Sequence, residues 1–204
     1  MKNPILAILA IAAMVACKKN QTTATDRSAD STGAPAAVTS DTVSGGDSVT
    51  APGNANSADS LSSDDKKFAD AAAMGGMMEV MMGKLAAGNA NNAAVKALGE
   101  MMVKDHSKAN DELKNWASKT GYTLPTGLDA EKQKRYDDLK AKKGAEFDKM
   151  YTDLMVSDHQ KDIAEFKKEA AGGKEASLKS FASKTLPTLE HHLMESEKAK
   201  TAVK

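Results

Sequence analysis

Four ionisable residues occupy positions where the surrounding helical pattern calls for apolar side chains. Glu79, His106, His159 and His192 each interrupt a series of apolar residues spaced three and four apart. Each lies near the middle of its own predicted helix, and mid-helix positions of an antiparallel bundle fall in one layer. We therefore expect the four side chains to meet in the core. One carboxylate and three imidazoles form a good ligand set for Zn(II), and the set also suits Fe(II), Mn(II) or Cu(II).

A polar layer in a core can also exist without a ligand. Buried histidines are often satisfied by a hydrogen bond or a water molecule, and Glu79 with the three histidines could form a closed network that fixes the helix register. The sequence leaves both interpretations open: a site for one metal ion or small ligand, or a network that only specifies the fold. His191 points about 100° away from His192 on the same helix and is expected at the surface.

Three aspartates stand close to the histidines in sequence. Asp105 and Asp158 directly precede His106 and His159, and Asp162 follows three residues after His159. Successive residues diverge by about 100° on a helix, so neither aspartate can face the ring of its own neighbour. We expect them to meet histidines of neighbouring helices as outer groups that orient the rings, with a solvated flank as the equal alternative.

The elements that must position these residues are helices, since no segment alternates with period two. Capping residues at the starts, with glycine or proline near the ends, delimit them. The predicted helices cover residues 63–87, 91–120, 129–143, 145–171 and 175–200. Four are long and of similar length, and three of the four connections between the five predicted helices are short. The pattern predicts an all-α protein, an antiparallel four-helix bundle with an extra short helix between the second and third long helices.

An internal repeat supports this bundle. Met-Val-Lys-Asp-His-Ser-Lys at 102–108 matches Met-Val-Ser-Asp-His-Gln-Lys at 155–161. A pair of helices that occurs twice is typical of a bundle with approximate twofold symmetry.

The first long helix is rich in methionine. Five of its residues cover more than one helix face: Met74, Met77, Met78, Met81 and Met82. Thioethers suit Cu(I), but flexible methionines more often fill irregular cores, and we predict core packing. Pro187 precedes His192 by about one turn, and Gly75-Gly76 precedes Glu79 similarly. Both features soften a helix just before the polar layer, which predicts room there for a ligand or water.

The composition excludes several classes of function. Lysine plus arginine equals aspartate plus glutamate at 28 each, and Arg27 and Arg135 are the only arginines. A nucleic-acid binder carries a basic patch, so nucleic acid is not an expected partner. The single cysteine excludes a disulfide framework and a CxxC metal site within the chain.

The beginning of the chain predicts export. Residues 1–16 combine Lys2 with an apolar stretch too short to span a bilayer, as in a signal peptide. Small residues before Cys17 resemble the bacterial lipobox, in which the cysteine is lipidated. Residues 17–62 are rich in Ser, Thr, Gly and Ala and predict a disordered tether. The folded domain is expected over 63–204. The protein is then anchored to the membrane by lipid, at the outer membrane facing the periplasm, with protein partners that the sequence does not identify.

Several blocks in order carry a family resemblance, namely A-A-M-G-G-M-M-E-V, M-x-V-K-D-H-S-K-A-N-D-E-L, D-H-Q-K-D and L-P-T-L-E-H-H-L. Over about residues 64–197 the chain resembles a bacterial family of exported proteins of unknown function, often labelled outer-membrane proteins. The resemblance implies a ferritin-like bundle in the periplasm, with recurrent polar positions at Glu79, His106, His159 and His192. It implies no activity.

The sequence departs from the di-iron bundles in lacking Glu-x-x-His, which argues against a two-metal oxygen-activating centre. The leading expectation is a non-enzymatic binding protein of the envelope with a single metal or small-ligand site. The alternatives are a structural or stress-related interaction protein and a metal-dependent enzyme.

Overall fold

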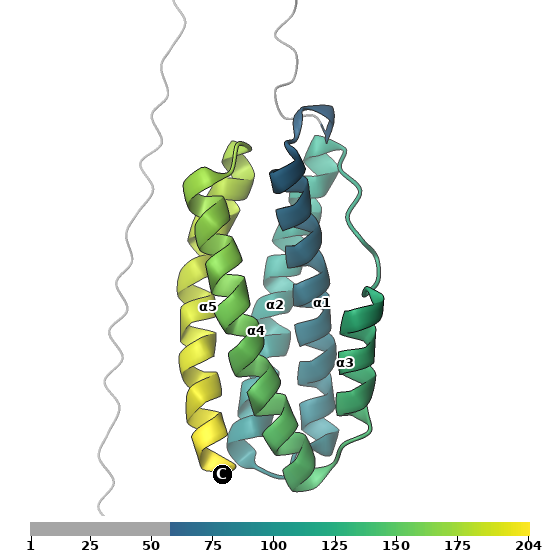
Figure 1. Ribbon diagram of the computed structural model, residues 1–204, viewed down its shortest axis with the longest axis vertical. Helices are drawn as coiled ribbons and strands as arrows, with labels where there is room; N and C mark the ends of the chain where they lie inside the picture. Colours follow the sequence, from purple (N-terminus) through teal and green to yellow (C-terminus); the bar gives the residue numbers. More distant parts are fainter. Residues whose placement is uncertain (1–57) are drawn as a thin grey trace, which may run out of the picture. The chain divides into compact units, whose positions relative to one another are not determined.

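The structure is a computed structural model that describes residues 58–204, and within them it is entirely helical (Figure 1). Its elements are the 3-10 helix η1 (Ala58–Ser60) and the helices α1 (Ser63–Asn89), α2 (Ala93–Thr120), α3 (Ala130–Lys140), α4 (Gly144–Gly172) and α5 (Ala176–Ala202). The predicted signal peptide, Cys17 and the tether up to residue 57 lie outside the described residues. Among the described helices, none is both long and apolar enough to cross a membrane.

The four long helices form an antiparallel bundle. Helix α1 packs beside α2 and α4 beside α5, while α2 also contacts α5 and α1 contacts α4. In Figure 1 the chain descends along α1, rises along α2, rises again along α4 and descends along α5. The short helix α3 lies in the connection between α2 and α4 and packs on α1 and α4. This arrangement confirms the predicted fold class, including the extra short helix.

The helix ends follow the capping chemistry of the sequence, with shifts of a few residues. Asn92 caps α2 by accepting a hydrogen bond from the backbone of Ala94, and Gly121 ends α2 in the left-handed region at φ 71°. The N-cap of α1 is Ser62, one residue earlier than predicted, because its hydroxyl and the Asp65 carboxylate form a reciprocal capping box. Helix α3 ends at Lys140, three residues earlier than predicted.

The folded unit begins slightly before the predicted boundary at residue 63. Leu61, which the sequence placed in the tether, is only 6% exposed and packs in the core cluster that contains Phe68 and Trp116. The sequence signal for this earlier boundary was the large aliphatic side chain of Leu61 beside the helix cap. Burial of this side chain extends the bundle by one turn.

Two apolar clusters flank the middle of the bundle. One is rich in aromatic residues and contains Phe68, Trp116 and Phe166. The other is rich in methionine and contains Met78, Met82, Met102 and Met155. Met78 and Met82 therefore pack in the core as predicted, while Met74, Met77 and Met81 are half-buried. On α2, α4 and α5 the position of the predicted polar layer lies between the two clusters, and on α1 Glu79 lies within the methionine-rich cluster, between Met78 and Met82.

A close approach of α1 and α2 depends on glycine. A Cβ atom at Gly83 would lie 2.6 Å from the Gly99 carbonyl oxygen, and one at Gly99 would lie 2.5 Å from the Ala86 Cβ. Both residues therefore have to lack a side chain for the two helices to meet this closely. The contact stands one turn from Glu79 and holds α1 and α2 in register near the layer.

Candidate metal centre

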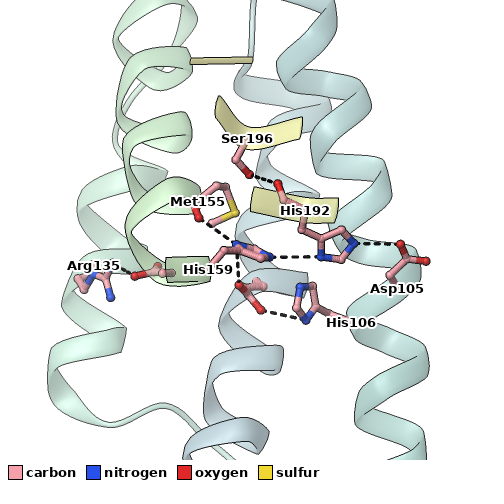
Figure 2. Close-up of polar contacts among 9 residues, drawn as sticks. Asp105, His106, Arg135, Met155, His159, His192 and Ser196 are labelled. Carbon is pink, nitrogen blue, oxygen red and sulfur yellow. Dashed lines mark hydrogen bonds and ion pairs between the residues drawn. The ribbon is translucent and has the colours of Figure 1, made fainter. Parts of the chain in front are cut away.

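The structure brings the four predicted residues together in the core. Glu79 comes from α1, His106 from α2, His159 from α4 and His192 from α5, and none is more than 6% exposed. The three imidazole ring centroids lie 5.1 to 5.6 Å apart. Figure 2 shows the three rings turned toward one another across the bundle. The 3.6-residue periodicity placed each residue on the core side, and the antiparallel packing aligned them in one layer.

One nitrogen of each ring faces an oxygen at the edge of this cluster. His159 Nδ1 lies 2.9 Å from the carbonyl oxygen of Met155. His192 Nε2 lies 3.0 Å from Asp105 Oδ2, and His106 Nδ1 lies 2.9 Å from Glu79 Oε2. The Met155 carbonyl oxygen and the Asp105 carboxylate accept hydrogen bonds, so His159 Nδ1 and His192 Nε2 carry the hydrogen of a neutral imidazole, and His106 Nδ1 does so when Glu79 is ionised. Hydrogen bonds of this kind fix the tautomer and the orientation of metal-binding histidines.

The other nitrogen of each ring then carries a lone pair, and these nitrogens converge. His159 Nε2 lies 3.2 Å from His192 Nδ1. His106 Nε2 is buried and has no hydrogen-bond partner among the described residues. One nitrogen from each ring lies within 4.8 Å of the other two. Facing lone pairs repel, so a proton, a water molecule or a metal cation between the rings would stabilise this arrangement.

Burial makes a proton a poor solution. It lowers the pKa of His106 and of His192 to about 4, although Asp105 acts in the opposite direction on both rings. Burial also lowers the pKa of His159, where Glu79 opposes it. All three rings are therefore neutral at pH 7, which is the protonation state that binds metals. A metal cation could satisfy the three lone pairs without protonating the rings.

Glu79 belongs to the edge of the cluster. Its Oε2 is engaged with His106, and its Oε1 lies 3.5 Å from His159 Nδ1 without a hydrogen-bond partner. Burial raises the pKa of Glu79 to about 7; His159 and Arg135 oppose the shift and Asp158 adds to it. The geometry thus places Glu79 where it can orient His106, and the converging donors are nitrogens only.

The three aspartates have different surroundings. Asp105 reaches from α2 to His192 on α5. Asp158 is 5% exposed and binds the Arg135 guanidinium of α3 at 2.5 Å, so its partner is an arginine rather than a histidine. Asp162 is half-buried beside Glu79, and burial, Glu79 and Asp158 raise its pKa well above the usual value.

Sequence reasoning missed Arg135, which Figure 2 shows on the far side of His159 from His192. The available signal was its position, since it is the only arginine after Arg27. It also missed the Met155 carbonyl oxygen, because a backbone acceptor leaves no mark in the sequence.

The comparisons with known proteins begin with a family match. The family described as Domain of unknown function (DUF4142) matches residues 50–199. The chain belongs to the DUF4142 family. Among proteins of curated function, none matches the sequence. The predicted export signal and lipid anchor of this DUF4142 protein stay predictions.

Solved structures share the fold of this DUF4142 chain at low sequence identity. A DUF305 fragment from Deinococcus radiodurans superposes with a TM-score of 0.61 at 9% identity, covering 70% of this chain and 98% of the fragment. CopM in its Cu(II)-bound form gives 0.58 at 14% identity, covering 68% and 96%. CopM in its silver-bound form gives 0.54 at 15% identity, covering 66% and 93%. These likenesses show the helical fold.

Proposed function

We propose that this protein binds one copper ion through His106 Nε2, His159 Nε2 and His192 Nδ1. The observation that carries the proposal is the convergence of three buried imidazole nitrogens within 4.8 Å of one another, of which His106 Nε2 has no hydrogen-bond partner among the described residues. A cation that accepts three lone pairs removes their repulsion, and the ring hydrogens already point to Glu79, Met155 and Asp105. Zinc holds imidazole nitrogens at about 2 Å, so the rings would move toward one another to bind an ion of this size.

The donor set favours copper over the other metals that the sequence allowed. Imidazole suits copper and zinc, whereas manganese prefers carboxylate oxygens. One oxygen of Glu79 and one of Asp105 are engaged by ring nitrogens, and the donors that converge are the three imidazole nitrogens. Cu(II) binds a given nitrogen site more tightly than the other divalent ions of its series, with zinc as the nearest competitor. The fold is also that of CopM, whose solved structures include Cu(II)-bound, Cu(I)-bound and silver-bound forms.

The proposal describes a non-enzymatic binding protein of the envelope. In it, a lipid on Cys17 anchors the chain, and the tether holds the bundle away from the membrane surface in the periplasm. A single deeply buried site of this kind suits retention of a metal ion. Its alternative is a layer that only specifies the fold, but such a layer would need a hydrogen donor for each inner nitrogen.

Copper content of the purified full chain tests the proposal. The protein is saturated with copper, dialysed exhaustively and analysed for metal per chain. We expect one tightly held equivalent in the wild type, its loss in His192→Ala, and its retention in His191→Ala. His191 is an exposed histidine next to His192 on the same helix, so this pair of variants is closely matched.

Copper held weakly by Cys17 or by methionines would persist equally in both variants. Circular dichroism confirms that each variant is folded. Absence of a tight equivalent in the wild type, or an equal loss in both variants, would overturn the copper proposal.

A further inference from the structure

A cavity of about 40 Å³ leads from the surface of the bundle toward the histidine layer. Its lining includes the exposed Glu165 of α4 and, at depth, the buried Glu79 and His106. Gly75-Gly76 also line it, so the cavity lies where the sequence predicted room beside the polar layer. The cavity therefore connects the surface with the layer on the side of Glu79 and His106.

The charged side chains that line this cavity are acidic. Glu165 is exposed, Asp162 stands about one turn away on the same helix and is half-buried, and Glu79 is 1% exposed. Among the described residues of the lining, none is lysine or arginine. Carboxyl groups therefore stand at every depth between the surface and the histidine layer.

Glu79 presents an unpaired oxygen at the inner end of this series. Its Oε1 is buried and has no hydrogen-bond partner among the described residues. A buried polar atom without a partner is costly, and an ionised one more so. Burial, Glu79 and Asp158 also raise the pKa of Asp162 well above its usual value. A cation that passes between Glu79 and Asp162 would stabilise the ionised form of both.

The basic residues of α3 do not supply this cation. Lys132 and Arg135 act to lower the pKa of Asp162, but each is paired with another aspartate. Lys132 Nζ lies 2.8 Å from Asp129 Oδ2, and the Arg135 guanidinium lies 2.5 Å from Asp158 Oδ1. The acidic lining is therefore available to a cation from outside the protein.

A second cavity reaches the layer between α2 and α5. It has a volume of about 130 Å³ and is lined by Asp105, which contacts His192. Its lining also includes Lys108 and Lys184, and Lys184 pairs with Glu112 at 2.9 Å. Lysines repel a metal cation and carboxylates attract it. The acidic cavity is thus the more favourable approach for a cation, although it is smaller.

We infer that Glu165, Asp162 and Glu79 form the route by which a metal cation reaches the histidine site. The inference rests on the proposed copper site. A cleft lined by one sign of charge raises the local concentration of the opposite ion and its rate of association. A cavity needs roughly 10–15 Å³ to hold one water molecule, so 40 Å³ admits an ion that has shed most of its water. The carboxylates replace that lost water, and His106 is the first ring the ion meets.

The rate of copper binding tests the route. Cu(II) is mixed rapidly with the metal-free full chain at low salt, and quenching of the fluorescence of Trp116, the only tryptophan, follows binding. We expect Asp162→Asn to lower the association rate constant about tenfold, at the low end of electrostatic steering, while one tight equivalent of copper is still bound. Added salt should slow the wild type more than Asp162→Asn, because salt screens the attraction.

Three further variants separate charge from structure. Asp162→Glu keeps the carboxylate and should retain the wild-type rate. Glu165→Gln removes an exposed charge at the outer end and should slow binding by a smaller factor. Glu112→Gln is the matched control, since it removes one carboxylate from the lining of the other cavity, and it should leave the rate unchanged.

The outcomes separate this inference from the proposed function. If the wild type retains no copper, the copper site is wrong and the route with it. If copper is retained and the rates of the wild type, Asp162→Asn and Glu165→Gln are equal, only the route is wrong, and the ion enters elsewhere. Slowing by Glu112→Gln as large as that by Asp162→Asn would also overturn it. Circular dichroism checks each fold, and Glu165→Gln decides the question if Asp162→Asn does not fold.

Discussion

The repeated Met-Val-x-Asp-His-x-Lys segment occurs on α2 and on α4, and its two copies have different partners. On α2, Asp105 lies 3.0 Å from His192 Nε2, and His106 faces the carboxylate of Glu79. On α4, Asp158 pairs with Arg135, and the His159 ring donates to a backbone carbonyl oxygen. Both histidines nevertheless turn a nitrogen toward the same point in the core.

The difference arises from what packs outside each copy. Helix α3 lies against α1 and α4 and supplies the Arg135 guanidinium to the α4 copy. The α2 copy faces α5, where Asp105 contacts His192. The shared sequence of the two copies therefore places both histidines on the core side of their helices. The partner of each aspartate depends instead on which helix packs beside it. Asp105 contacts a ring that burial keeps neutral, and Asp158 contacts a permanent cation.

The largest expected effect is on the pH dependence of stability, which tests whether the His192 ring in contact with Asp105 is neutral. The folded pKa of His192 is lowered to about 4 from 6.5, so between these pH values the unfolded chain binds a proton that the folded chain does not. Its contribution to stability is complete above pH 6.5 and is lost as pH falls toward 4. The metal-free protein should lose about 3 kcal/mol of unfolding free energy over this window through His192.

Denaturant unfolding at several pH values measures this loss. His192→Asn removes one titrating group and should reduce the slope, while His191→Asn, which changes an exposed neighbour, should retain the wild-type slope. The slope that remains in His192→Asn comes from His106 and His159, whose pKa values burial also lowers. Groups elsewhere in the bundle contribute to both profiles alike. If His192→Asn keeps the wild-type slope, the ring is charged in the folded protein and pairs with Asp105 as an ion.

The ion pair of the α4 copy should matter for stability rather than for metal binding. Arg135→Met leaves the buried Asp158 carboxylate without its partner. A fully buried pair broken in this way costs about 3–5 kcal/mol, and the partial exposure of Arg135 reduces the expected loss to about 2–3 kcal/mol. Urea unfolding of the metal-free protein gives the value. Lys134→Met is the control on the same helix, where the exposed pair with Asp138 contributes at most about 1 kcal/mol.

Substitution of the two equivalent aspartates, Asp105 and Asp158, should have different effects on copper affinity. Asp105→Asn replaces a carboxylate that holds the His192 ring, and loss of such an orienting group lowers metal affinity by about 10- to 100-fold. Asp158→Asn, at the equivalent position of the other copy, should leave copper affinity unchanged. Competition titration against a chelator of known affinity measures both. Equal effects of the two substitutions would mean that the copies are functionally equivalent after all.

The sequence predicted the helices and the layer because both depend on local periodicity. Glu79, His106, His159 and His192 were identifiable as polar residues on apolar stripes, and antiparallel packing of helices of similar length aligns such positions. The partner of Asp158 was not predictable in this way. It depends on how the chain between α2 and α4 folds back, and helix periodicity says nothing about where a short helix docks.

The different positions of Glu79 and the three histidines within the layer also could not be predicted from the sequence. One face of a helix can bring Glu79 and three histidines together, but the sequence cannot tell which ring nitrogen faces inward. That choice depends on acceptors such as the Met155 carbonyl oxygen and Asp105 Oδ2, whose positions follow from rotamers and packing. The hypothesis of four metal ligands thereby becomes three converging nitrogens and one carboxylate at the edge.

The smallest expected effect decides the role of Glu79 in the α2 copy. In Glu79→Gln the side-chain amide oxygen can still accept from His106 Nδ1, so an orienting role predicts a loss of copper affinity of only about tenfold. A role as fourth ligand predicts a much larger loss, with a changed Cu(II) spectrum because an oxygen donor leaves the coordination sphere.

The amide cannot ionise, so the variant also removes the titration that the raised pKa of Glu79 places near pH 7. Affinity measured at pH 6 and pH 8 should therefore differ less in Glu79→Gln than in the wild type. A small loss of affinity in Glu79→Gln would mean that His106 on α2 and His159 on α4 have the same role. In each of them an oxygen would hold one ring nitrogen, and the other ring nitrogen would bind copper.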